Sequence, residues 1–105
     1  MINEVRIEGI WQEAPELKAG SADGSVLLAT GRIIHRRERA AGEPVTYYFN
    51  VLGRNEIARA MAAFRAGEGC LIEGRLQVHS WVDPTTSFKR TIFEIYATSV
   101  EKRIL

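Results

Sequence analysis

The sequence predicts an all-β protein of five strands, with one short α-helix between the third strand and the fourth. Five stretches are rich in branched and aromatic residues or alternate apolar with polar side chains, as strands do. One alanine-rich stretch instead has apolar residues at helical spacing. The 105 residues are enough for a single modest core. We therefore expect one domain that spans residues 1–105.

The strands are separated by polar segments that carry turn residues. In the first strand Val5 and Ile7 point inward by alternation, and Gly9 is expected to bend the chain. The connections contain the glycine, proline and aspartate residues typical of turns, and Gly53 ends the third strand. The five strands are expected at residues 3–11, 26–34, 45–52, 69–81 and 88–100.

The helix is expected at residues 56–66, where Asn55 offers an N-cap and Gly67 a C-cap. Its apolar face has the spacing i, i+4, i+7 and consists of Ile57, Met61 and Phe64. Three strands, a helix and two further strands are the layout of the OB-fold, a five-stranded Greek-key barrel. This fold commonly binds oligonucleotides or oligosaccharides, although a fold alone does not establish a function.

The fourth strand organises the functional prediction because its two faces differ. One face is expected to be core and consists of Ile72, Leu76 and Val78, with Gly74 as a bend or bulge between them. The other face is polar and partly basic, and consists of Glu73, Arg75, Gln77, His79 and Trp81. Single-stranded nucleic acid needs such a platform, since bases stack on aromatic rings while cations follow the phosphates.

The composition excludes several classes of protein. Cys70 is the only cysteine, so neither an internal disulfide nor a thiolate metal cluster is possible, and we expect it to be buried. His35 and His79 are interpreted as polar-face residues, without the spacing of metal ligands. No phosphate-binding glycine loop or nucleophile motif is present, so we expect no enzyme, cofactor, metal or small-molecule substrate. No membrane span or signal peptide is apparent, which predicts a cytoplasmic protein or an imported organellar one.

The aromatic residues divide between core and surface. Trp81 has polar neighbours and is a candidate for base stacking, although it could instead cover an oligomer contact or lie flat over the barrel rim. Trp11 is expected in the core or in an interface. Tyr47 falls on the apolar side of its strand, so Tyr48 is the better stacking candidate, with a cross-strand pairing role as the alternative.

Positive charge is densest around the predicted loop at residues 35–43. Four arginines here suit phosphate contacts: Arg32, Arg36, Arg37 and Arg39. They could instead form a solvated loop whose positive charge is partly offset by Glu38 and Glu43. Supporting candidates for phosphate contact are Arg54, Arg75, Lys89 and Arg90. The net charge of +1 argues against indiscriminate binding to duplex DNA.

Several short motifs together resemble the bacterial single-stranded DNA-binding protein family. The resemblance rests on residues 71–76 followed by Trp81, on residues 1–5, on Gly9 followed by Pro15 and Glu16, on residues 28–30, on Gly53, and on Arg90 and Glu94. It covers nearly the whole chain. It implies an OB-fold that forms a homo-oligomer, usually a tetramer, with single-stranded DNA wrapped over strand faces and hairpin loops.

The sequence departs from the family's four stacking positions. Trp81 is present, but Ile34, Thr46 and Leu52 stand where the family has aromatic rings, and Tyr48 lies on the same face as Thr46. The resemblance thus adds Ile34 and Leu52 to the expected contact surface, with reduced stacking capacity. The family also has a long tail with an acidic tip, whereas this sequence ends at Leu105. Primosomal replication protein N is a tailless relative of similar length and fold.

Three hypotheses follow. The first is a sequence-tolerant single-stranded DNA-binding protein of replication, recombination or repair. The second is an accessory protein of replication restart that also contacts other proteins. The third is an oligomeric scaffold that has lost DNA binding. Apolar residues near the N-terminus suggest that the first strand contributes to a dimer or tetramer interface: Ile2, Val5 and Ile7.

Overall fold

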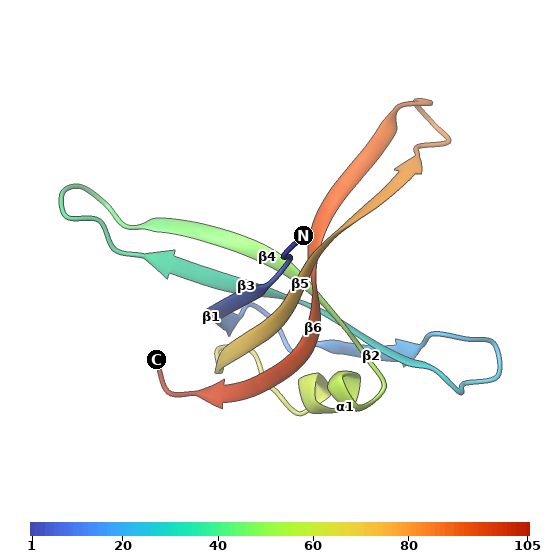
Figure 1. Ribbon diagram of the computed structural model, residues 1–105, viewed down its shortest axis with the longest axis horizontal. Helices are drawn as coiled ribbons and strands as arrows, with labels where there is room; N and C mark the ends of the chain where they lie inside the picture. The colour runs from blue at the N-terminus through green and yellow to red at the C-terminus, as the bar shows by residue number, and fades with distance from the viewer.

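A computed structural model describes residues 1–105 and contains six strands and one helix. The elements are β1 (Val5–Trp11), β2 (Glu16–Ala19), β3 (Leu27–Arg37), β4 (Val45–Arg54), α1 (Glu56–Ala62), β5 (Gly69–Val82) and β6 (Lys89–Arg103) (Figure 1). All five predicted strands are present. The additional strand, β2, lies where a polar connection and a loop were predicted. Its four residues are all exposed, so no buried side chain gave a periodic signal.

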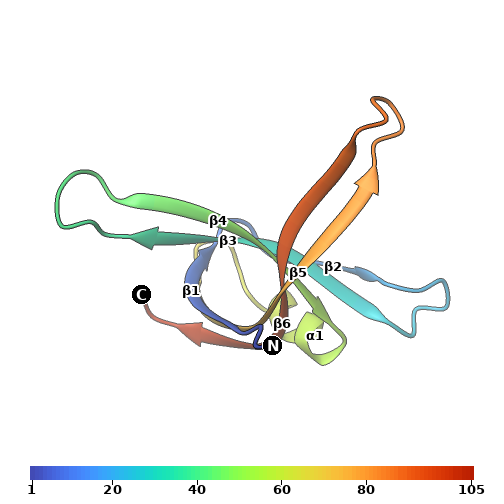
Figure 2. The same cartoon turned by 45° about the horizontal axis from the view of Figure 1, so that its top comes forward.

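Five of the strands close into a barrel. The sheet order is β1-β5-β6-β4-β3-β2, and β1 also pairs with β3 through Ile10↔Ile34 and Trp11↔Ile33. The pairing of β4 with β6 is parallel, and the other pairings are antiparallel. This closed barrel, with α1 between β4 and β5, confirms the OB-fold. Figure 2 shows the β2–β3, β3–β4 and β5–β6 hairpins extending from the barrel as arms.

The core lies inside the barrel and is closed at one end by α1. Trp11 is fully buried, as predicted, and its ring packs against Phe64 with centroids 5.8 Å apart. Ala58 and Met61 are the buried residues of α1. Cys70 is also buried, and this burial raises the pKa of its thiol to about 11. No helix in the structure has the length and apolar character needed to cross a bilayer.

The helix ends are formed differently from the prediction. Asn55 precedes α1, but its side chain does not cap the helix; its Oδ1 accepts a hydrogen bond from the Leu27 backbone N–H at 3.1 Å. The helix ends at Ala62, several residues before Gly67. Gly67 has φ +86° and donates its N–H to the Trp11 carbonyl at 2.8 Å. The positive φ of this turn, which brings the N–H to Trp11, accounts for the glycine, and Gly67 does not cap α1.

Gly74 marks the point where the β5–β6 hairpin leaves the barrel. The predicted bulge is present: Glu73 pairs with Ser99 and Gly74 with Ala97, so that Thr98 is the extra residue. A Cβ atom on Gly74 would collide with the Tyr96 carbonyl oxygen. Beyond this point the predicted core face is wrong, since Leu76 and Val78 are 41% and 56% exposed while Ile72 is buried. Alternation assigned these side chains to one face, but no element of the chain covers that face along the hairpin.

Candidate nucleic-acid interface

One continuous surface runs across β5, β6, β4 and β3 on the side that faces away from the core. Core residues such as Ile33, Val51 and Ile95 alternate with the side chains of this surface. We call it the outer face. Its residues are Thr30, Arg32, Ile34 and Arg36 of β3, Tyr48, Asn50, Leu52 and Arg54 of β4, Arg90, Ile92, Glu94 and Tyr96 of β6, and Arg75, Gln77, His79 and Trp81 of β5.

The β3–β4 part of the outer face brings together predicted residues that are distant in sequence. Ile34 lies opposite Tyr48 in the register, and Tyr48 is 55% exposed. Arg32 and Arg36 flank Ile34 on the same side of β3. An exposed ring, an apolar neighbour and two guanidinium groups therefore share one surface. The proximity of rings and cations suits a polyanion with aromatic bases.

The other arginines of this hairpin point elsewhere. Arg37 pairs with Val45, so alternation places its side chain on the opposite face from Arg36. Arg39 lies in the loop and donates from Nε to the Glu43 carbonyl at 3.1 Å. Arg36 forms an exposed ion pair with Glu38 at 3.2 Å. The predicted arginine cluster thus divides between two faces and a loop.

The β5–β6 hairpin carries the second exposed ring. Trp81 is 42% exposed, lies opposite Arg90, and has its ring centroid 5.5 Å from that of His79. Arg90 is also paired with Asp83 at 3.4 Å. Lys89 belongs to the other face of the hairpin, since it lies one residue before Arg90. Trp81 therefore has an aromatic and a cationic neighbour, as its predicted role requires.

Closer to the barrel, Arg75 stacks on an aromatic ring of the outer face. Its guanidinium carbon lies 4.5 Å from the centroid of the Tyr96 ring. Tyr96 lies beside Leu52 across the parallel β4–β6 pairing. Such a cation–π pair contributes roughly 0.5–1 kcal/mol at an exposed site. The pair holds a planar cation against the Tyr96 ring. Tyr96 was not among the contact residues predicted from the sequence.

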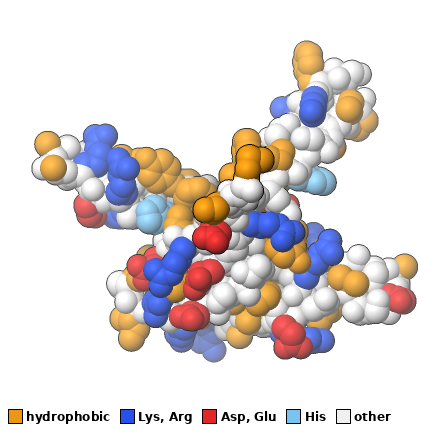
Figure 3. Space-filling model, in the orientation of Figure 1, with side chains coloured by type: hydrophobic (Ala, Val, Ile, Leu, Met, Phe, Trp, Pro, Cys, Tyr) orange, Lys and Arg blue, Asp and Glu red, His pale blue; other side chains and the backbone are white.

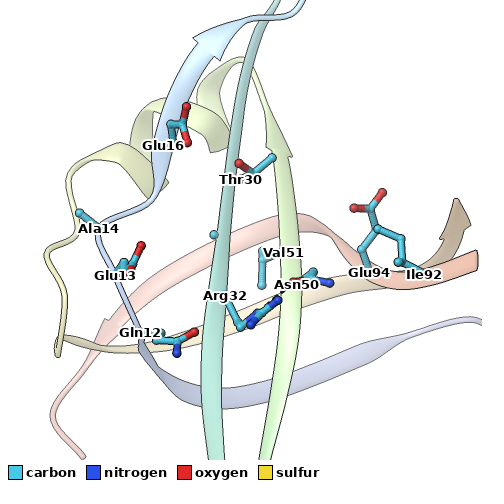
Figure 4. Close-up of a pocket in the computed structure, with 11 residues that line it drawn as sticks. Gln12, Glu13, Ala14, Glu16, Thr30, Arg32, Asn50, Val51, Ile92 and Glu94 are labelled. Carbon is cyan, nitrogen blue, oxygen red and sulfur yellow. Dashed lines mark hydrogen bonds between the residues drawn. The ribbon is translucent and has the colours of Figure 1, made fainter. Parts of the chain in front are cut away.

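Between these aromatic regions the surface is hollowed. The hollow is bordered on one side by the connection from β1 to β2 and on the other by β6 (Figure 4). Its polar lining comes from four elements and one connection: Gln12, Glu13, Glu16, Thr30, Arg32, Asn50 and Glu94. Only Arg32 of these was a predicted contact. The alternation of β4 could have indicated Asn50, but nothing local to Glu94 shows that β6 lies beside β4.

Charge is distributed unevenly over the molecule. Figure 3 shows Lys and Arg side chains on the β3–β4 and β5–β6 hairpins and also on the barrel, where most of the visible Asp and Glu side chains lie. The cations of the outer face therefore extend along two arms. The net charge of +1 does not reveal these local cations.

Two curated relatives are similar over most of this chain. A single-stranded DNA-binding protein of Helicobacter pylori is 37% identical over 90 residues, which cover 81% of this chain and 49% of the relative. A single-stranded DNA-binding protein of Thermus aquaticus is 29% identical over 80 residues, which cover 76% of this chain and 30% of the relative. The chain thus corresponds to less than half of each relative. The model of the single-strand binding protein family matches residues 2–102, and the chain belongs to that family.

Proposed function

We propose that the protein binds single-stranded DNA, largely independently of sequence, through the outer face. The observation that carries this proposal is the arrangement of Tyr48, Trp81 and the arginines on one continuous surface across four strands. Family membership supports it, because proteins of this family are non-enzymatic and bind DNA. The prediction that the chain is not an enzyme agrees with the family.

In the proposed mechanism, bases stack on the exposed rings while guanidinium groups neutralise phosphates. Trp81 and Tyr48 supply the rings, and Ile34 supplies an apolar contact where the family would have an aromatic one. Arg36 and Arg90 lie beside these positions and are suited to the adjacent phosphates. Because this chain has fewer stacking rings than the family, we expect it to bind single-stranded DNA more weakly.

The proposed role is the protection of single strands in DNA replication, recombination or repair, in the cytoplasm at the nucleoid or in an organelle. Replication or repair proteins are further candidate partners. A restart accessory protein would use the same face while contacting other proteins. An oligomeric scaffold is favoured only by the missing rings at Ile34 and Leu52.

A salt titration tests the proposed binding. Fluorescence anisotropy with oligo-dT should give an affinity that falls with salt, since each neutralised phosphate contributes about −0.7 to the slope of log affinity against log salt. Arg36→Ala should flatten that slope by about 0.7 for each loop that contacts DNA. Arg37→Ala is the matched control, since it removes the same charge from the opposite face. Equal slopes in all three proteins would assign Arg36 to solubility, and no binding would support the scaffold hypothesis.

We also propose a homo-oligomer, a dimer or a tetramer, because the β5–β6 hairpin exposes an apolar face. This face, opposite Trp81, contains Leu76, Val78, Val82 and Phe93, all exposed. Residues 5–9 of β1 also form no ladder with β3, and on that side the Glu8 carbonyl contacts only a side chain, His35 Nδ1 at 2.8 Å. Light scattering at micromolar concentration should give a multiple of 11.8 kDa. Val78→Arg should lower this mass, whereas His79→Arg on the outer face should not; a monomeric parent protein would contradict the proposal.

A further inference from the structure

We propose that four polar side chains in a row across the outer face read the edge of one base and favour cytosine over thymine. The row consists of Arg32, Asn50, Glu94 and Gln77, which we call the polar row. This proposal rests on the proposed function, because it concerns the same DNA strand. It adds a base preference to a surface that otherwise binds by stacking and charge.

The polar row is continuous because its four members are register partners on adjacent strands. Arg32 pairs with Asn50, Asn50 with Glu94, and Glu94 with Gln77. Two hydrogen bonds fix the side chains: Arg32 Nε donates to Asn50 Oδ1 at 3.3 Å, and Gln77 Nε2 donates to Glu94 Oε1 at 2.8 Å. No such bond joins Asn50 to Glu94. The row therefore consists of two hydrogen-bonded pairs, with no hydrogen bond between Asn50 of β4 and Glu94 of β6.

These two bonds determine which groups remain for a ligand. Because Asn50 Oδ1 accepts from Arg32, the amide presents its Nδ2 hydrogens, and the guanidinium presents its terminal nitrogens. Glu94 retains Oε2, and Gln77 retains its carbonyl oxygen. The β3–β4 side of the row thus offers donors, and the β6–β5 side offers acceptors. Neighbouring strands are about 4.8 Å apart, so the edge of one base can contact both sides.

The charges around the row favour a base over a phosphate. Three carboxylates line the hollow, Glu13, Glu16 and Glu94, against one guanidinium, that of Arg32 (Figure 4). Glu94 takes part in none of the ion pairs of the molecule, so its charge is not neutralised by a neighbouring cation. Close to these carboxylates a phosphate would be repelled, whereas a base with an amino group would be attracted. Tyr48 lies two residues before Asn50 on the same face of β4, and its exposed ring supplies a stacking surface beside the hollow.

Cytosine matches the order of donors and acceptors. Its exocyclic N4 amino group can donate to Glu94, as carboxylates do accept from cytosine N4. Its N3 and O2 atoms can accept from Asn50 and Arg32. Thymine carries the O4 acceptor in place of the amino group, so its edge would set an oxygen against the Glu94 carboxylate. The two pyrimidines have rings of similar size, so the row would distinguish them by the hydrogen-bonding groups on their edges.

The test compares oligo-dC and oligo-dT of equal length by anisotropy. The measured quantity is the ratio of the Kd for oligo-dT to the Kd for oligo-dC, in the parent protein, in Glu94→Gln and in Glu13→Gln. Self-stacking of the free oligonucleotides cancels when these ratios are compared between proteins. Glu94→Gln should lower the ratio about fivefold, because an amide can donate to thymine O4 as well as accept from cytosine N4, and about fivefold is the lower end of what a good base contact discriminates. Glu13→Gln removes the same charge from the rim of the same hollow and should leave the ratio unchanged.

Other outcomes would overturn the proposal. An equal ratio in Glu94→Gln and the parent protein would show that the polar row does not read bases. An equal fall in Glu13→Gln would show a general effect of charge. Should Glu94→Gln melt early, Asn50→Asp tests the row from its donor side and should also lower the ratio, and an unchanged ratio there would count against the row. Failure of the parent protein to bind either oligonucleotide would defeat the proposed function itself.

Discussion

Replacing Trp11 with alanine should lower the free energy of unfolding by about 3–5 kcal/mol, the usual cost of removing a large aromatic side chain from a core. Trp11 is fully buried, packs against Phe64, and lies so close to Gly31 that a Cβ there would be 2.6 Å from its ring. Surrounding strands of a closed barrel cannot collapse fully into the cavity. Urea denaturation of both proteins would measure the change. Binding of oligo-dT should persist below the melting temperature, because Trp11 faces away from the outer face.

Trp11→Phe is the matched control for this variant. The indole Nε1 is buried and bonds to no other residue of the chain. Phenylalanine removes that N–H and keeps a ring against Phe64. We therefore expect Trp11→Phe to be clearly more stable than Trp11→Ala. If the alanine variant instead matched the parent protein within about 0.5 kcal/mol, as a surface substitution would, the core position of Trp11 would be wrong.

Replacing Trp81 with alanine should weaken oligo-dT binding about 5- to 150-fold, which corresponds to about 1–3 kcal/mol for one stacked base. Trp81 is 42% exposed, lies on the outer face and is flanked by His79 and Arg90. Its substitution should change the melting temperature little, since its ring is not part of the core. Anisotropy titrations and thermal melts of the same samples would measure both effects.

Val82→Ala is the control from the opposite face of the hairpin, where an exposed side chain one residue later is removed. We expect it to leave the affinity for a single strand nearly unchanged at protein concentrations that preserve the oligomer. Trp81→Phe should retain much of the affinity because a ring remains. Early melting of Trp81→Ala with unchanged affinity would contradict the assignment and would identify Trp81 as a structural residue.

Much of this fold could be predicted from alternation, because the two-residue period of a strand is a property of the local chain. It identified five strands, and it placed Trp81 with Arg75 and His79 on one side of β5. It failed for β2, whose four exposed residues are paired only with the edge of β3. The residue preference of helix ends failed at Asn55, since the Leu27 N–H, 28 residues away, donates to the oxygen that would have capped the helix.

The sequence by itself determined on which face of its own strand each candidate residue lies, because neighbouring side chains of a strand must alternate. Only the tertiary structure decided which faces are covered and which strands are neighbours. Leu76 and Val78 are exposed because their hairpin leaves the barrel at Gly74. Asn50 lies beside Glu94, 44 positions later in the sequence, because β4 and β6 pair in parallel. This contact is stabilised by closure of the whole barrel rather than by either segment.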